Sequence, residues 1–239
     1  MEFHPNKCQV LRVTKKTSPA TDIPYSLHGH TLEVVDDTKY LGVTISGDLN
    51  WDKHINTILN KANSTLAVLK RNIKIPSKNV KSVAYKTLVR PLLEYCSSVW
   101  DPPTKQLKSK LEMVQRRSAR WVHNSYYHGP NSTSPSDMIV DLEWPLLETR
   151  RQHARLCLLY KMRHDLVHMS SRSFLSQYPY LTRSMPPHAL LPMDLLPPKN
   201  YYCSTFFPKT IKEWNSLPPF TASATSLEEF KSLLMAGVG

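Results

Sequence analysis

The chain has 239 residues and a formal net charge of +12, which is enough length to bury a core in one domain or two small ones. Its 19 prolines and only 6 glycines favour helices joined by stiff connections over a many-stranded β-fold with glycine turns. No apolar run approaches the roughly 20 residues that span a bilayer, the N-terminus lacks the apolar stretch of a signal peptide, and the four cysteines are widely spaced. These features predict an intracellular protein of the nucleus or cytoplasm, with reduced thiols, that is neither secreted nor bound to a membrane.

Residues 1–50 predict a small β-element, too small to be stable alone. Residues 8–14 form a predicted strand, and 25–27 and 31–35 form a predicted hairpin with Gly29 at its turn. A third strand is predicted over 39–46, followed by a Gly-Asp turn and a helix that begins near Asp52.

The region 51–124 predicts three helices. The first covers 52–72, where apolar residues recur at helical spacing. The second begins after Ser77 and is expected to kink at Pro91, because proline removes the hydrogen bond to the Thr87 carbonyl. The third covers about 105–123. We expect the second helix to bury a face made of Val80, Val83, Ala84, Leu88, Leu92, Tyr95, Cys96 and Val99.

A loop over 124–136, rich in Ser, Asn, Gly and Pro, separates the third helix from a C-terminal region, 137–239. A helix is predicted over 146–168, and short helices over 211–217 and 226–235. The intervening residues 174–208 are rich in Pro and Tyr and predict irregular structure. The whole chain is therefore predicted to be α+β and mainly helical.

The positive charge is concentrated in one part of the chain. The net charge is −1 over 1–50, +11 over 51–130 and +2 over 131–239. Lysine and arginine contact phosphates at long range and without regard to base sequence, so this block predicts binding to an RNA or DNA duplex. The alternative is a basic surface that only keeps the protein soluble. The predicted phosphate-binding residues are Lys61, Lys70, Arg71, Lys74, Lys78, Lys81, Lys86, Arg90, Arg116, Arg117 and Arg120.

Metal-dependent chemistry is not predicted. Asp36 and Asp37 form a carboxylate pair, but no suitable third carboxylate precedes them, so we interpret them as loop residues. His164 and His168 have a spacing that can bind zinc, yet no glutamate base or third ligand accompanies them, which favours a polar helix end. No metal site and no catalytic residue are therefore predicted.

Several short segments, in order along the chain, resemble the reverse transcriptases of non-LTR (LINE-type) retrotransposons. The segments MEFHPNKC (1–8), YSLHG (25–29) and KYLGV (39–43) resemble the end of the palm and the hairpin that holds the primer. The segments LNWDKH (49–54), LKRN (69–72), LVRPLLEYCSSVW (88–100) and LEMVQRRSAR (111–120) resemble the thumb. The segment STFFPKTIKEWNSLP (204–218) resembles the block that follows the thumb.

The resemblance implies that the chain is the C-terminal part of an RNA-directed DNA polymerase. The family's catalytic aromatic-x-Asp-Asp motif and partner aspartate lie before Met1, so Mg²⁺ is expected only in the full-length polymerase. The implied role is template–primer binding by the helical thumb. The implied primer-grip-like residues are Gly29, Lys39, Tyr40, Leu41 and Gly42.

Two further hypotheses are compatible with the sequence. The chain is either a stand-alone, non-catalytic nucleic-acid-binding remnant, or the inert product of a truncated element. The sequence predicts no oligomeric state.

Overall fold

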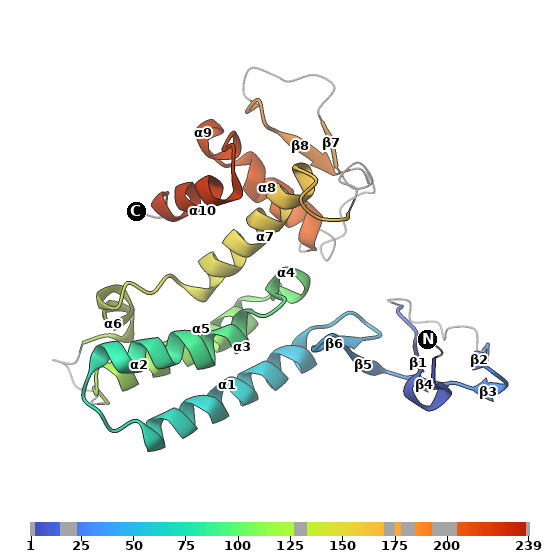
Figure 1. Cartoon of the computed structure of the whole chain (residues 1–239), viewed down its shortest axis with the longest axis horizontal. Coiled ribbons are helices and arrows are strands. Elements are labelled where there is room, and N and C mark those ends of the chain that lie inside the picture. Colours follow the sequence, from blue (N-terminus) through green and yellow to red (C-terminus); the bar gives the residue numbers. More distant parts are fainter. Residues whose placement is uncertain are drawn as a thin grey trace. The chain divides into compact units, whose positions relative to one another are not determined.

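The computed structural model describes residues 3–14, 23–126, 133–169, 175–177, 185–192 and 205–237. The structure is mainly helical α+β, as predicted (Figure 1). It divides into two compact units: unit 1 comprises Met1–Leu93 and Thr104–Asn124, and unit 2 comprises Glu94–Pro103 and Ser125–Gly239. The predicted regions 1–50 and 51–124 therefore lie together in unit 1, except for residues 94–103.

The β-element of unit 1 consists of three separate two-stranded sheets. β1 pairs with β4 in parallel, whereas β2–β3 and β5–β6 are antiparallel hairpins. Val43 is the only apolar side chain that is buried among the described residues before Trp51. This part of the chain therefore has almost no core of its own. The elements are η1 (Pro5–Lys7), β1 (Gln9–Leu11), β2 (Ser26–Leu27), β3 (His30–Thr31), β4 (Glu33–Val35), β5 (Asp37–Tyr40) and β6 (Val43–Ser46).

The predicted strand 39–46 is in fact a hairpin, β5–β6. Its turn is Leu41-Gly42, where both residues have positive φ, 46° and 85°. Such a turn matches the twist of the two flanking strands and needs glycine or another residue that tolerates positive φ. Gly29, with φ 79°, turns β2 into β3 as predicted, but the following residues leave that hairpin to form β4 beside β1.

The helices of unit 1 form a three-helix bundle. α1 packs against η2 and α5, and α2 packs against α5 (Figure 1). The observed bounds of α1 are those predicted, and its buried side chains recur at helical spacing from Ile55 to Leu69. The helices are α1 (Asp52–Asn72), α2 (Lys78–Ala84), the π-helical turn η2 (Tyr85–Val89), α3 (Arg90–Glu94) and α5 (Lys105–Val122). Ser77 and Thr104 cap α2 and α5, each accepting from a backbone N–H three residues later.

The predicted buried face of the second helix is wrong. Val80, Val83, Leu88, Tyr95 and Val99 are exposed, and the side chains that face the bundle are Lys81, Ser82, Tyr85, Val89 and Leu93. The large Tyr85 ring is buried and its hydroxyl bonds the buried Gln115 amide oxygen at 2.9 Å, so an aromatic with a polar partner takes the inward position.

Pro91 does not stop the helix, as expected: α2, η2 and α3 adjoin without a break from Lys78 to Glu94. The turn before Pro91, η2, is π-helical, and the Arg90 N–H donates to the Tyr85 carbonyl five residues earlier. A π-turn adds a residue to the helix and changes its hydrogen-bond pattern locally. The helix then ends near Tyr95, since Cys96 is left-handed with φ 56°, and a new short helix follows.

Unit 2 is built around α7 and α8. Its core contains Leu156 and Tyr160 of α7, Trp214 of α8 and Phe230 of α10. α7 is shorter than the predicted 146–168, and α8 begins earlier than the predicted 211–217. The elements are α4 (Ser97–Trp100), α6 (Pro135–Asp141), α7 (Leu147–Arg163), β7 (Leu175–Gln177), β8 (Leu190–Pro192), α8 (Phe206–Asn215), α9 (Pro219–Ala222) and α10 (Leu227–Ala236).

β7 and β8 pair in antiparallel fashion within the predicted irregular segment 174–208, and Asn215 fixes β8 by bonding both backbone groups of Leu190. Most of the remaining residues of that segment, and Cys203, lie outside the described residues.

Candidate nucleic-acid interface

The basic bundle, residues 51–93 and 104–124 of unit 1, has a larger net positive charge than the +12 of the whole chain. It contains fifteen lysines and arginines but only two acids, Asp52 and Glu112, which gives a net charge of +13. The other two acids between 51 and 124 are Glu94 and Asp101, and both belong to unit 2, where they pair with arginines. Because these two acids belong to unit 2, the net charge of the bundle is higher than the +11 of residues 51–130.

The predicted phosphate-binding residues differ in exposure. The exposed ones are Lys61, Arg71, Lys74, Lys78, Arg116 and Arg117; the half-buried ones are Lys70, Lys86, Arg90 and Arg120; Lys81 is buried. Lys61, Arg71, Lys74, Lys86, Arg116 and Arg120 make no ion pair with any other described residue. Their charges are therefore available to an external anion.

Two cations, Lys70 of α1 and Arg117 of α5, lie near each other where these two helices pack together. The Arg117 guanidinium donates to the Asn63 amide oxygen at 3.2 Å and to the Met113 sulfur at 3.4 Å, both uncharged acceptors. Burial lowers the pKa of Lys70, and the nearby Arg117 charge lowers this pKa further. Two like charges held close together are relieved by a bound anion, so this seam is the strongest candidate for a phosphate contact.

Lys81 has a structural role. Its ammonium donates to the Trp121 carbonyl at 3.4 Å and to the Asn124 side-chain oxygen, and lies 5.7 Å from the centre of the Trp121 ring. Carbonyls in the last turn of a helix lack backbone partners and carry partial negative charge. Lys81 therefore caps the C-terminal end of α5, and at 3 % exposure it does not reach a phosphate.

Three lysines of α5 were absent from the predicted set. Lys105 and Lys110 are exposed and Lys108 is half-buried. All three lie on the helix that carries Arg116, Arg117 and Arg120. The charge pattern of this helix, with Glu112 as its only acid, was the signal that could have included them.

The primer-grip-like residues fall on two different hairpins. Lys39, Tyr40, Leu41 and Gly42 form the tip of β5–β6, with Tyr40 and Leu41 64 % and 73 % exposed. Gly29 lies at the turn of β2–β3, a separate sheet. Two large apolar side chains exposed at one hairpin tip form a surface suited to contact with another molecule.

His54 fixes the β5–β6 hairpin to α1. The side chain is buried in the first turn of α1, and its Nδ1 accepts the Thr44 backbone N–H of β6 at 3.2 Å. Lys53 adds an ion pair to Asp37 of β5. Asp37 begins strand β5, so the prediction of a loop residue is wrong for Asp37, whereas Asp36 lies in the bend before the strand.

Acidification is expected to weaken the attachment of this hairpin, because only an unprotonated Nδ1 accepts the Thr44 N–H. Burial lowers the pKa of His54 below its ordinary 6.5, so near and below pH 6.5 the unfolded chain binds a proton more readily than the folded chain. The His54 contribution is complete above this pH and declines as the pH falls toward the folded pKa. Urea unfolding of the wild type and of His54→Gln across about pH 5–8 checks it.

The difference between the two unfolding free energies is expected to shrink as the pH falls. The pKa values of His153, His164 and His188 are also lowered by burial, but these residues are present in both proteins and cancel in the difference. A difference that stays constant over the pH range would contradict the role given to His54.

Unit 2 is organised by a buried ion network that the sequence did not reveal. The Asp101 network consists of Asp101, Arg151, Arg155, Lys209 and Glu213. Asp101 follows α4 and accepts a hydrogen bond from Arg151 Nε at 2.9 Å. It also forms ion pairs with Arg155, whose Nη1 lies 2.8 Å away, and with Lys209 of α8. Arg155 reaches Glu213 at 2.6 Å. Burial by itself raises the pKa of Asp101, but the charges of Arg155, Lys209 and Arg151 together bring it below its ordinary value.

No group of three or more His, Cys, Asp or Glu side chains is placed to hold a metal ion in the part of the chain that the structure describes. His164 ends α7 and stacks on Tyr160, with ring centres 4.1 Å apart. Within the same described ranges, no helix has the length and apolar character needed to cross a membrane.

These features define a mainly helical α+β chain with a strongly basic bundle, and sequence comparison gives it a relative. Over 141 residues, 58 % of the chain, it is 22 % identical to the probable RNA-directed DNA polymerase from transposon BS of Drosophila melanogaster. The matched part spans only 16 % of that protein's length. No family model and no solved structure matches the chain. The similarity supports a relationship to the reverse transcriptases of transposons.

Proposed function

We propose that this chain is the end of the palm, the thumb and the following region of a LINE-type reverse transcriptase. In this proposal the basic bundle grips the RNA template–DNA primer duplex through its phosphates. The catalytic aspartates and Mg²⁺ belong to a palm in the longer protein, and this chain contributes binding alone.

The charge of the basic bundle carries the proposal. Fifteen basic residues are opposed by two acids, and the other acids of the region are engaged in unit 2. An ordinary solvated helix surface mixes charges of both signs. A polymerase thumb must follow a duplex of any sequence, which phosphate contacts permit and base contacts do not.

The resemblance and the observed elements support the same assignment. The segment 49–54 ends in the first turn of α1, and 111–120 lies wholly within α5. The similarity to a transposon RNA-directed DNA polymerase agrees with both. The exposed tip of β5–β6, joined to α1 through His54, is where a primer grip would lie next to the thumb.

Salt dependence of binding tests the proposal. The purified chain is titrated with two RNA–DNA hybrids of unrelated sequence at several salt concentrations. We expect equal affinity for both, and a fall of about 10³–10⁵ between roughly 50 and 200 mM salt if 6–10 phosphates are contacted. Binding that is insensitive to salt, or confined to one of the two sequences, would contradict a phosphate grip.

A further inference from the structure

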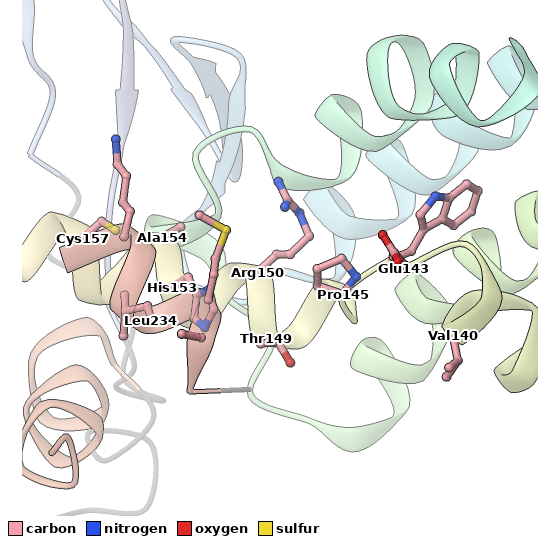
Figure 2. Close-up of a pocket in the computed structure, with 13 residues that line it drawn as sticks. Val140, Glu143, Pro145, Thr149, Arg150, His153, Ala154, Cys157 and Leu234 are labelled. Atoms are coloured by element: carbon pink, nitrogen blue, oxygen red, sulfur yellow. The ribbon is translucent and has the colours of Figure 1, made fainter. Parts of the chain in front are cut away.

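A groove of about 910 Å³ runs along the side of α7 in unit 2 (Figure 2). None of the predicted phosphate-binding residues lines it. The α7–α10 groove is lined on one side by a single face of α7, formed by Thr149, Arg150, His153, Ala154 and Cys157, and on the other by Leu234 and Met235 of α10. The α7 face extends over nine residues, from Thr149 to Cys157, which is roughly 12 Å or two helical turns.

The groove has an apolar floor and exposed apolar side chains on its rim. Leu234 is buried, whereas Met235 is 66 % and Val140 75 % exposed. Ala154 lies in the middle of the α7 face that lines the groove, and its small, exposed side chain leaves room there for another molecule. A trough between two helices with an exposed apolar rim is the shape into which an amphipathic helix packs its apolar stripe.

Charge differs between the two ends of the groove. Glu143 lies toward the α6 end and Cys157 toward the opposite end (Figure 2). Burial raises the pKa of the Cys157 thiol, and the charges of Lys231 and Lys161 partly offset this rise, so both ammonium groups act at that end. Arg150, between the ends, is paired with Glu94 through two hydrogen bonds.

We propose that the α7–α10 groove is a docking site for an amphipathic helix of a partner protein. The helix lies between α7 and α10 with its apolar stripe inward. Its N-terminus, which carries partial positive charge, lies near Glu143. Its C-terminal end and an acidic side chain there lie near Lys231. The site is independent of the proposed nucleic-acid binding, because it lies within unit 2 and shares no residue with the basic bundle.

Two synthetic peptides test the proposal. Both are helices of roughly 15 residues with the same leucine stripe; one carries glutamates in its last turns and the other carries lysines there. We expect the glutamate peptide to bind the 239-residue chain roughly ten-fold more tightly, since only it complements Lys231. Binding is measured by fluorescence anisotropy of the labelled peptides.

Variants locate the binding site. Ala154→Trp fills the groove and is expected to abolish binding of both peptides, whereas Ser232→Trp adds the same bulk to α10 outside the lining and leaves binding unchanged. Lys231→Glu is expected to reverse the preference between the peptides, and Lys212→Glu, the same change on α8, is expected to keep it.

A second measurement uses Cys157, after Cys8, Cys96 and Cys203 have been replaced by serine. The glutamate peptide is expected to slow alkylation of Cys157 by iodoacetamide at least several-fold, as a helix seated in the groove covers the thiol. Equal binding of the two peptides, binding unaffected by Ala154→Trp, or groove-dependent binding of anionic lipid vesicles in place of the glutamate peptide would each overturn the proposal.

Discussion

Asp101→Ala is expected to lower the free energy of unfolding of unit 2 by about 3–5 kcal/mol, the usual cost of removing one partner from a buried ion network. The substitution removes the carboxylate that pairs with the buried Arg151 and leaves the buried Arg155 with Glu213 alone. Lys209 of α8 loses the same partner. Urea unfolding followed by tryptophan fluorescence measures the effect, because Trp100 is buried directly beside Asp101 and Trp214 lies in the core of unit 2.

Two controls separate the charge from the shape of Asp101. Asp101→Asn keeps the shape and one hydrogen-bond acceptor, so it is expected to lose most but not all of the same stability. Glu228→Ala removes an exposed carboxylate from α10 and is expected to change stability by less than about 0.5 kcal/mol. An Asp101→Ala protein as stable as the wild type would mean that the network does not hold unit 2 together.

Replacement of Lys70, Arg71 and Lys74 by alanine is expected to weaken binding to an RNA–DNA hybrid on the order of 10²-fold at moderate salt. Lys70 lies near Arg117, where α1 packs against α5. Arg71 is exposed in the last turn of α1, and Lys74 is exposed just beyond its end. Each lost phosphate contact lowers the slope of log affinity against log salt by about one, so the slope is expected to fall by about 2–3.

A matched triple variant shows whether position or total charge matters. Replacing Lys7, Lys212 and Lys231 by alanine removes the same three charges outside the basic bundle and is expected to change the salt slope by less than about one. Far-ultraviolet circular dichroism confirms that both variants keep their helices. Equal losses in the two triple variants would show that net charge alone attracts the nucleic acid.

The sequence predicted best the parts of the fold whose signal is local. The bounds of α1 followed from its apolar spacing, and those of α5 differed by one residue. The second helix was predicted with the wrong face, because Lys81 and Tyr85 are held inward by Trp121 and Gln115, which lie 40 and 30 residues later. Apolar periodicity contains no information on such partners.

The sequence predicted which part of the chain is basic, but not which of its charged side chains are exposed or paired. A charge count found the basic block, yet it could not tell that Lys81 is buried or that Glu94 and Asp101 are engaged in unit 2. The Asp101 network left no periodic trace in α7, since Arg151 and Arg155 occupy positions on its buried face where apolar residues would mark a core. Their role depends on a carboxylate some fifty residues earlier in the chain.

The distance along the chain between Asp101 and its partners sets the order in which the protein can fold during synthesis. Arg151 follows Asp101 by 50 residues and Lys209 by 108. At the usual rates of translation the ribosome needs on the order of 5–20 s to add the 108 residues between Asp101 and Lys209. Once α5 has emerged, the helices of the basic bundle can pack, while residues 94–103, between α3 and α5 in the chain, await α7 and α8. During synthesis, residues 94–103 therefore lie between two folded helices of unit 1 without their ion-pair partners, until α7 and α8 have emerged.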